Sequence, residues 1–228
     1  MARITELRAF LSFFYDLLTR LYPLEKLVHG PEGVTSVRTA ETYYPFIREI
    51  CLTRVVETFD LYVVSILREI FEKRPEMLKS ESPIDAATAL ELRTFEEMVR
   101  YLAERKVHEL SFRPLSELRK FISSRTGIDL FPTDDAFRDV LLASEVRNLV
   151  AHNDCRVNDL FLRRTGLALE TLPLLPGRRF LISEEWFAKT SYIFDSLVFD
   201  FDAAAAQKFG LECSHEFKSF RVRYDPPQ

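Results

Sequence analysis

The sequence predicts an all-α fold, and three observations support this prediction. Glycine is rare, with 6 residues in 228, which disfavours an all-β architecture because tight hairpin turns need glycine. Apolar residues recur at three- and four-residue spacing in several long segments, which is the period of an amphipathic helix. Hydrophobic residues make up 47% of the chain, which is enough to build a sizeable core from such helices.

The first two periodic segments are residues 6–21 and residues 40–71. The first has one apolar stripe and stops before Pro23. Because charged and polar residues interrupt it, we interpret it as an amphipathic helix and not as a signal peptide. The second carries an apolar face through about eight turns and is expected to form the spine of the fold. Pro45 falls near its expected start, and Pro75 lies just beyond its end.

Two further helices are predicted in the middle of the chain. A serine–proline pair ending at Pro83 has the pattern of a helix start, and residues 86–107 carry periodic apolar positions, so one helix is expected there. Pro114 is expected to open a shorter helix that closes before Gly127. The stretch that follows, as far as Pro132, is predicted to be a loop.

The C-terminal part of the chain has a looser pattern beyond Asn153. Residues 178–182 are interpreted as a short extended piece. Ser183 has the position of an N-cap for a final helix, and Gly210 is placed to end that helix. Residues 211–228 are expected to be a tail that docks on the body or on a partner chain.

Composition and charge narrow the class of function. The net charge of -4 argues against a broadly basic nucleic-acid surface, so any contact with RNA must be local. Arginine is in local excess between residues 147 and 179, although a run of charge is more often a solvated face. The 3 cysteines are widely spaced without a CxxC pair, which fits neither a disulfide framework nor a zinc ribbon. No segment is apolar enough to span a bilayer. We therefore expect a cytoplasmic protein with no membrane partner.

The helix that follows Thr133 carries the candidate functional residues. Thr133 and the two aspartates after it have the pattern of a helix start, and periodic apolar positions extend the helix to Val150. Asn148 and His152 lie one turn apart on one face of this helix, and Arg147 lies on the shoulder of that face. A polar stripe is therefore predicted at the end of the helix, where it can meet a ligand or a partner.

The spacing of Arg147 and His152 resembles the Arg-x4-His motif of the HEPN (higher eukaryotes and prokaryotes nucleotide-binding) superfamily. The motif's place, near the end of a late helix that follows a long second helix, is similar to that in predicted toxin and defence branches of the superfamily. The resemblance implies a HEPN-like helical bundle of about four to five core helices within a single domain over residues 1–228. The core would span about residues 40–165, and residues 166–228 would form a C-terminal extension, with an extra helix and a tail, that packs on it.

The same resemblance implies a homodimer in which the two motif helices face each other, so that both copies line one composite active site. It also implies endoribonuclease activity without a metal, in a toxin or antiphage-defence role, with a cognate antitoxin as a further partner. Some toxins of the family carry a tyrosine two residues after the histidine, where a partner nucleotidyltransferase modifies them. This chain has Asp154 at that position, which argues against control by that modification.

The chemistry of the motif residues is consistent with cleavage of RNA. Histidine exchanges a proton near neutral pH, so His152 is suited to move a proton to or from a ribose hydroxyl. Arg147 would clamp the scissile phosphate and stabilise the charge that develops on it. Asn148 would orient His152 or hold a phosphate oxygen. The expected products carry a 2′,3′-cyclic phosphate and a 5′-hydroxyl, and no metal or cofactor is expected.

Three other interpretations of these residues stay open. The polar stripe could belong to a non-catalytic HEPN-type module that binds a nucleotide or a protein and dimerises. Arg147 could pair with Glu145 or Asp154 as an ion pair at the helix end. His152 and Cys155 have the spacing of half a metal site, but the sequence offers no second pair of ligands.

Overall fold

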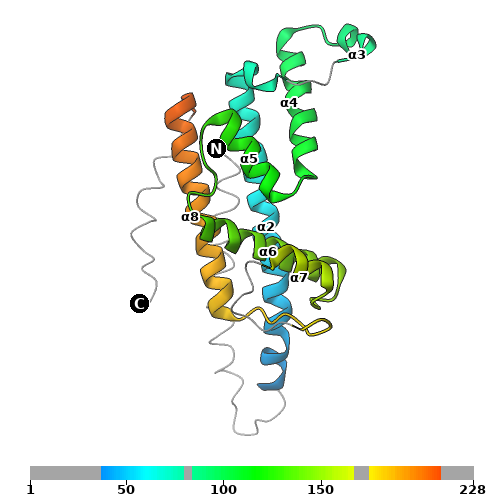
Figure 1. Cartoon of the computed structure of the whole chain (residues 1–228), viewed down its shortest axis with the longest axis vertical. Helices are drawn as coiled ribbons and strands as arrows, with labels where there is room; N and C mark the ends of the chain where they lie inside the picture. The colour runs from blue at the N-terminus through cyan, green and yellow to red at the C-terminus, as the bar shows by residue number, and fades with distance from the viewer. Residues whose placement is uncertain (1–36, 80–83, 167–174, 212–228) are drawn as a thin grey trace. The chain divides into compact units, whose positions relative to one another are not determined.

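The computed structural model describes residues 37–79, 84–166 and 175–211. Regular structure in these ranges is helical, so the all-α prediction is confirmed for the described part of the chain (Figure 1). The helix predicted at residues 6–21 and the tail after Leu211 lie outside the described residues. The described elements are, in chain order, α2 (Val37–Lys73), η1 (Pro75–Leu78), α3 (Ala86–Glu91), α4 (Phe95–Ser111), α5 (Leu115–Thr126), α6 (Asp134–His152), α7 (Asp159–Thr165) and α8 (Glu184–Phe209).

The chain divides into two compact units, each built from two main stretches of sequence. Of the described residues, the α4–α5 unit contains those of Asp60–Phe131 and residues 196–211. The α6–α7 unit contains the residues up to Phe59 together with Pro132–Asp195, and it holds the candidate functional residues. The long helices α2 and α8 therefore contribute one part to each unit. The expectation of a single domain stays a prediction.

Helix α2 confirms the predicted long helix. Its buried side chains recur at the helical period, which is why one face of the helix packs along its length. Pro45 lies inside the helix, whereas the sequence placed it near the start. None of the helices in the described ranges is both long enough and apolar enough to cross a membrane. The buried residues of α2 include Leu52, Val55, Val56 and Phe59 in the α6–α7 unit and Val63, Leu67, Ile70 and Phe71 in the α4–α5 unit.

The prediction of one helix over residues 86–107 is wrong, because the chain forms two helices there, α3 and α4. Thr94 starts α4 with a capping box. Its hydroxyl accepts a hydrogen bond from the backbone N–H of Glu97 at 3.1 Å, and the Glu97 carboxylate accepts one from the backbone N–H of Thr94 at 3.2 Å. This pair satisfies backbone N–H groups that a new helix start leaves open, and so favours a break over a continuous helix.

Helix α5 begins after Pro114 and ends at Thr126, before Gly127, as predicted. Gly127 has a φ of 62°, the left-handed conformation that commonly ends a helix and that glycine adopts without steric cost. Phe121 of α5 contacts Phe71 of α2 edge to face, with 6.3 Å between the ring centroids. Aromatic packing of this kind joins α5 to α2 within the α4–α5 unit.

Helix α6 confirms the helix predicted after Thr133 and extends past Val150 to His152. The Thr133 hydroxyl accepts a hydrogen bond from the backbone N–H of Ala136 at 3.1 Å, which caps the first turn. Acidic residues occupy that turn, where they interact favourably with the helix dipole. The face that packs into the α6–α7 unit consists of Val140, Leu142, Ala143, Val146 and Leu149.

Helix α7 was not predicted, because a helix of seven residues is too short for its period to stand out in the sequence. Its N-cap is Asn158, whose side chain accepts a hydrogen bond from the backbone N–H of Phe161 at 2.8 Å. Helix α7 lies against α6 (Figure 1). Phe161 is buried and its ring contacts the ring of Phe180, which in turn contacts Trp186.

Helix α8 has the predicted caps. The Ser183 hydroxyl accepts a hydrogen bond from the backbone N–H of Trp186 at 3.1 Å, and Gly210 follows the last turn with a φ of 66°. Within the α6–α7 unit, Phe194 of α8 packs edge to face on Phe59 of α2 at 4.9 Å between centroids. The two long helices therefore share an aromatic contact in the unit that carries the candidate site.

Candidate functional site

The three predicted site residues lie within the last two turns of α6. His152 is the last residue of the helix, and its side chain is exposed. Arg147 and Asn148 are half-buried one turn before it. Val146 and Leu149 are buried, so the helix packs through its apolar side; His152 is exposed, whereas Nε of Arg147 is buried. The helix end therefore presents an imidazole, an amide and a guanidinium within a short length of chain.

Asn148 is held by an acidic residue on the same helix. Its amide nitrogen donates to Oε2 of Glu145 at 3.4 Å, and Nη1 of Arg164, on α7, lies 3.3 and 3.4 Å from the two oxygens of the same carboxylate. The Glu145 side chain is only 13% exposed, against 52% for Arg164. Because the amide N–H of Asn148 points to Glu145, its amide oxygen lies on the other branch and can accept from a further donor.

The turn after α6 folds back on the last helical turn. The carbonyl of Leu149 accepts hydrogen bonds from the backbone N–H of Asn153 at 2.8 Å and from that of Cys155 at 3.0 Å. Asp154 and Cys155 adopt φ values of 48° and 54°, in the left-handed region that residues other than glycine seldom occupy. The chain therefore turns sharply immediately after His152.

The segment that precedes α8 pairs with this turn in antiparallel fashion. The backbone N–H of Phe180 donates to the carbonyl of Cys155 at 2.8 Å, and that of Val157 donates to the carbonyl of Arg178 at 2.9 Å. Phe180 is buried. The extended piece predicted at residues 178–182 is thus consistent with the structure, and it brings part of the C-terminal extension to the end of α6.

Arg179 connects the turn to α2 through two carboxylates. One terminal nitrogen lies 2.7 Å from Oε1 of Glu49, and the other lies 3.0 Å from Oδ1 of Asp154. The guanidinium also lies over the ring of Phe46, 5.3 Å from its centroid. The hydrogen bond to Glu49 is the main cause that raises the pKa of Arg179 above its ordinary value. We call Glu49, Arg179 and Asp154 the Arg179 bridge.

Sequence reasoning did not single out the Arg179 bridge. Glu49 and Arg179 are 130 positions apart, so no local spacing relates them. The one signal that touched Arg179 was the local excess of arginine between residues 147 and 179. Arg164 belongs to the same stretch, and its contact with Glu145 was also missed.

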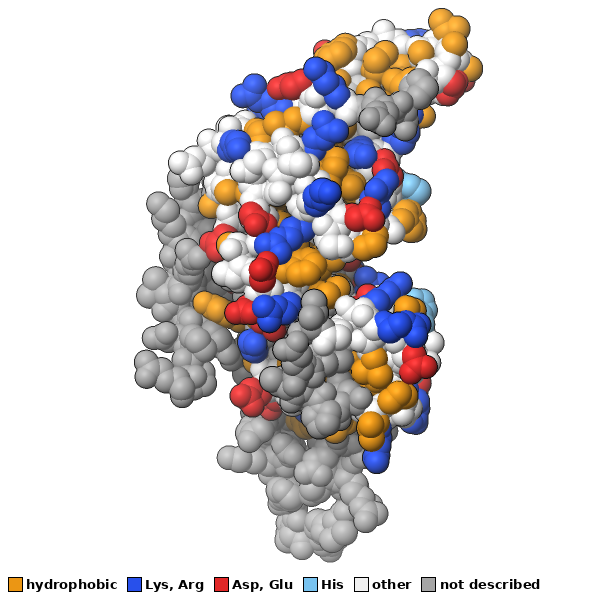
Figure 2. Space-filling model, in the orientation of Figure 1, with side chains coloured by type: hydrophobic (Ala, Val, Ile, Leu, Met, Phe, Trp, Pro, Cys, Tyr) orange, Lys and Arg blue, Asp and Glu red, His pale blue; other side chains and the backbone are white. Residues whose placement is uncertain are grey.

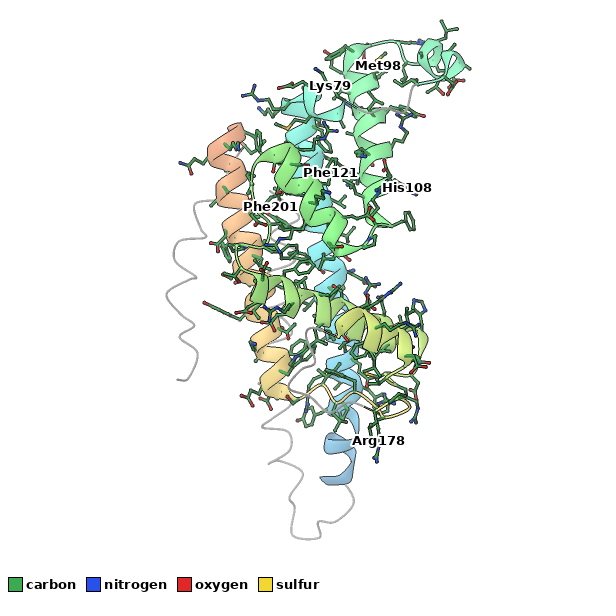
Figure 3. All side chains as sticks on the ribbon, in the orientation of Figure 1. Lys79, Met98, His108, Phe121, Arg178 and Phe201 are labelled. Atoms are coloured by element: carbon green, nitrogen blue, oxygen red, sulfur yellow. The ribbon has the colours of Figure 1, made fainter. Side chains whose placement is uncertain are left out.

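The surface around the site carries charges of both signs. Lys and Arg side chains alternate with acidic ones over the α6–α7 unit (Figure 2). Arg163 and Arg178 are exposed, and Figure 3 shows Arg178 pointing outward from the segment before α8. This mixture is in line with a local site and not with a broad basic face.

Cys155 does not share the exposed environment of His152. Its side chain is buried, and burial, followed by the nearby Glu49 carboxylate, raises the pKa of the thiol to about 11. Across residues 37–79, 84–166 and 175–211, no group of three or more His, Cys, Asp or Glu side chains is arranged to hold a metal ion. The pairing of His152 with Cys155 as half a metal site therefore gains no further ligand from the described structure.

The candidate site is thus described by its own contacts: an exposed imidazole at a helix end, an amide held by Glu145, and a turn joined to α2 by Arg179. These contacts come from α2, α6, α7 and the segment before α8, all within one compact unit. Comparison with protein-family models, with curated proteins and with solved structures finds no match for this chain.

Proposed function

We propose that this chain is a metal-independent endoribonuclease of the HEPN type, acting in a toxin or antiphage-defence role. The observation that carries the proposal is the exposure of His152 at the end of α6, one turn after Asn148 and five residues after Arg147. An exposed imidazole, with an amide and a cation in the same two turns of helix, is suited to move a proton at a phosphate-bearing substrate. The all-α architecture, with the motif near the end of a late helix, is in line with a HEPN-like bundle.

In the proposed reaction the 2′-oxygen of a ribose attacks the adjacent phosphorus, and the bond from phosphorus to the next 5′-oxygen breaks. The proton of the 2′-hydroxyl passes to one imidazole, and a protonated imidazole gives a proton to the departing 5′-oxygen. The products are a 2′,3′-cyclic phosphate and a 5′-hydroxyl, so the step balances without a co-reactant. Arg147 would bind the phosphate oxygens and stabilise their developing charge, and the amide oxygen of Asn148 would orient the imidazole of His152.

A homodimer would supply the second imidazole. The base and the acid must be different groups if both act in one step, and each chain brings one His152. Two α6 helices that face each other would place both copies of His152 and Arg147 around one cleft, with RNA as the substrate. A cognate antitoxin would then act by covering this end of α6.

A cleavage assay in EDTA tests the proposal. The wild type, His152→Ala and His108→Ala are incubated with a labelled structured RNA, and the end groups of the products are identified. His108 is the matched control, because it is also exposed but lies on α4 with its ring 4.9 Å from that of Phe112. We expect cyclic phosphate ends from the wild type and His108→Ala, and a loss of at least about a hundredfold in rate for His152→Ala.

Several results would contradict the proposed reaction. They are 3′-hydroxyl ends, equal cleavage of DNA, activity that EDTA abolishes, or an unchanged rate in His152→Ala. If no RNA is cleaved while the chain is an intact dimer, the non-catalytic HEPN-type binding module becomes the better assignment. Expression in a bacterial host gives a second readout, because a toxin should arrest growth and His152→Ala should relieve the arrest.

A further inference from the structure

The backbone immediately after the candidate site is strained. Asp154 and Cys155 have φ values of 48° and 54°, and both are side-chain-bearing residues in the left-handed region. Such conformations persist only where the surrounding structure holds them, and they concentrate at functional sites. The strained pair begins two positions after His152, so the contacts that hold it also bear on the end of α6.

The Arg179 bridge is one of two side-chain ion pairs that hold this turn, the other being Arg156 Nε with Oδ2 of Asp154 at 3.5 Å. The inner end of the Arg179 bridge is fixed, because the Glu49 side chain is 11% exposed and belongs to α2. Its outer end is Asp154, whose side chain is 66% exposed and sits in the strained turn itself. Arg179 spans both carboxylates with the two terminal nitrogens of one planar guanidinium, which a shorter or single-headed cation could not do.

Backbone hydrogen bonds connect the turn to the end of α6, so a change in the turn alters the last helical turn. The carbonyl of Leu149 accepts from Cys155 as well as from Asn153, so the left-handed turn closes over the last turn of α6. If the turn opens, this second bond is lost and the last helical turn is free to fray. The residue displaced by such fraying is His152, which ends the helix.

We infer that Arg179 is a positioning residue of the candidate site, which fixes His152 by holding the strained turn through Asp154. This inference rests on the proposed function. Arg179 is not suited to bind RNA phosphates directly, because both of its terminal nitrogens are engaged by carboxylates and its side chain is 27% exposed. Its loss should therefore lower the rate of the chemical step and leave RNA affinity unchanged.

The test compares Asp154→Asn, Arg179→Gln and Arg179→Lys with the wild type. Asp154→Asn is the variant that keeps the fold safest, since the residue is exposed and asparagine tolerates a left-handed φ. Arg178→Gln is the matched control, because it removes a neighbouring positive charge from a side chain that points outward (Figure 3). The readouts are the single-turnover rate at saturating RNA and the dissociation constant for RNA, the latter in a His152→Ala background.

We expect the single-turnover rate to fall by about tenfold in Asp154→Asn and Arg179→Gln, because small displacements of a catalytic group cost rates of this order or more. Arg179→Lys should lie between these variants and the wild type, since lysine can keep one of the two ion pairs. Arg178→Gln should keep the wild-type rate. Equal rates for Asp154→Asn, Arg179→Gln and the wild type would overturn the inference, and so would a loss confined to RNA affinity.

A second measurement does not depend on catalysis. Amide hydrogen exchange of Asn153 and Cys155, measured by NMR without RNA, should become faster in Arg179→Gln and in Asp154→Asn and stay unchanged in Arg178→Gln. If the wild type cleaves no RNA, the proposed function fails, but faster exchange in Arg179→Gln would still show that Arg179 holds the turn, since that variant keeps the ion pair of Arg156 with Asp154. Unchanged exchange would overturn the inference whatever the RNA assay shows.

Discussion

Truncation of Phe180 to alanine should destabilise the α6–α7 unit strongly. Phe180 is 5% exposed and belongs to the segment that pairs with the turn after α6. Its ring meets Phe161 of α7 at 6.0 Å between centroids with an interplanar angle of 69°, and meets Trp186 of α8 at 5.5 Å with an angle of 67°. One side chain thus joins α7, the segment before α8 and the start of α8.

The magnitude follows from burial and from the two ring contacts. Replacing a buried phenylalanine with alanine costs about 3–5 kcal/mol through lost burial and the cavity that remains. The two edge-to-face pairs contribute about 0.5–1.5 kcal/mol each beyond their burial, which keeps Phe180→Ala above the lower end of that range, at about 4 kcal/mol. Phe180→Leu keeps most of the volume and should cost about 1.5 kcal/mol.

Urea unfolding followed by tryptophan fluorescence is the assay. The chain has 1 tryptophan, Trp186, which lies in the unit concerned and touches Phe180 directly. With a denaturant dependence of roughly 2–3 kcal/mol per molar, Phe180→Ala should lower the urea midpoint by about 1.5 M. Leu181→Ala is the control, because Leu181 is 76% exposed and its loss should change stability by no more than about 0.5 kcal/mol. Equal midpoints for Phe180→Ala and Leu181→Ala would refute the packing described for this segment.

Two further predictions concern helix capping and the cysteines. Thr133→Ala should lower the stability of the α6–α7 unit by about 1 kcal/mol in the same urea assay, and Thr133→Ser should not, because only a hydroxyl accepts the bond from Ala136. In a Cys213→Ser background, Cys51 and Cys155 should react with a thiol reagent only after unfolding at pH 8, since burial raises their pKa values to about 12 and about 11. The folded chain then keeps thiol protons that the unfolded chain loses, so stability should fall as pH rises from the ordinary cysteine value toward 11. Rapid modification of the native variant, or stability that rises through this window, would contradict the buried assignment.

Much of the helical framework could be predicted because its determinants are local. Helices α5, α6 and α8 begin at Pro114, Thr133 and Ser183 and end near the positions expected from the sequence. The start of each helix depends on side chains within three residues of its N-cap. The face by which each helix packs depends on apolar residues that recur every three or four positions. The break before Thr94 is equally local in its cause, since Thr94 and Glu97 form the capping box. The break was not predicted, because apolar residues recur at helical spacing across the whole of residues 86–107.

The candidate site also has a part that local sequence predicts and a part that it does not. The sequence by itself determined that Arg147, Asn148 and His152 share the end of one helix, and that Asn148 and His152, four residues apart, lie on the same face of it. Their roles in RNA cleavage stay a prediction, as do dimerisation, a cognate antitoxin and a place in the cytoplasm. The three motif residues are thus the part of the site that one helix can specify alone.

Only the tertiary structure decided what surrounds those residues. Glu49 and Arg179 are 130 positions apart, and their contact exists because α2, the turn after α6 and the segment before α8 pack in one unit. The left-handed conformations of Asp154 and Cys155 also depend on that packing, since a Cβ makes the left-handed region costlier than the right-handed one for both residues. Helix periods and caps are set by neighbours along the chain. The Arg179 bridge and the turn after α6 are set by residues that are distant in sequence but close in space, so local sequence patterns could not predict them.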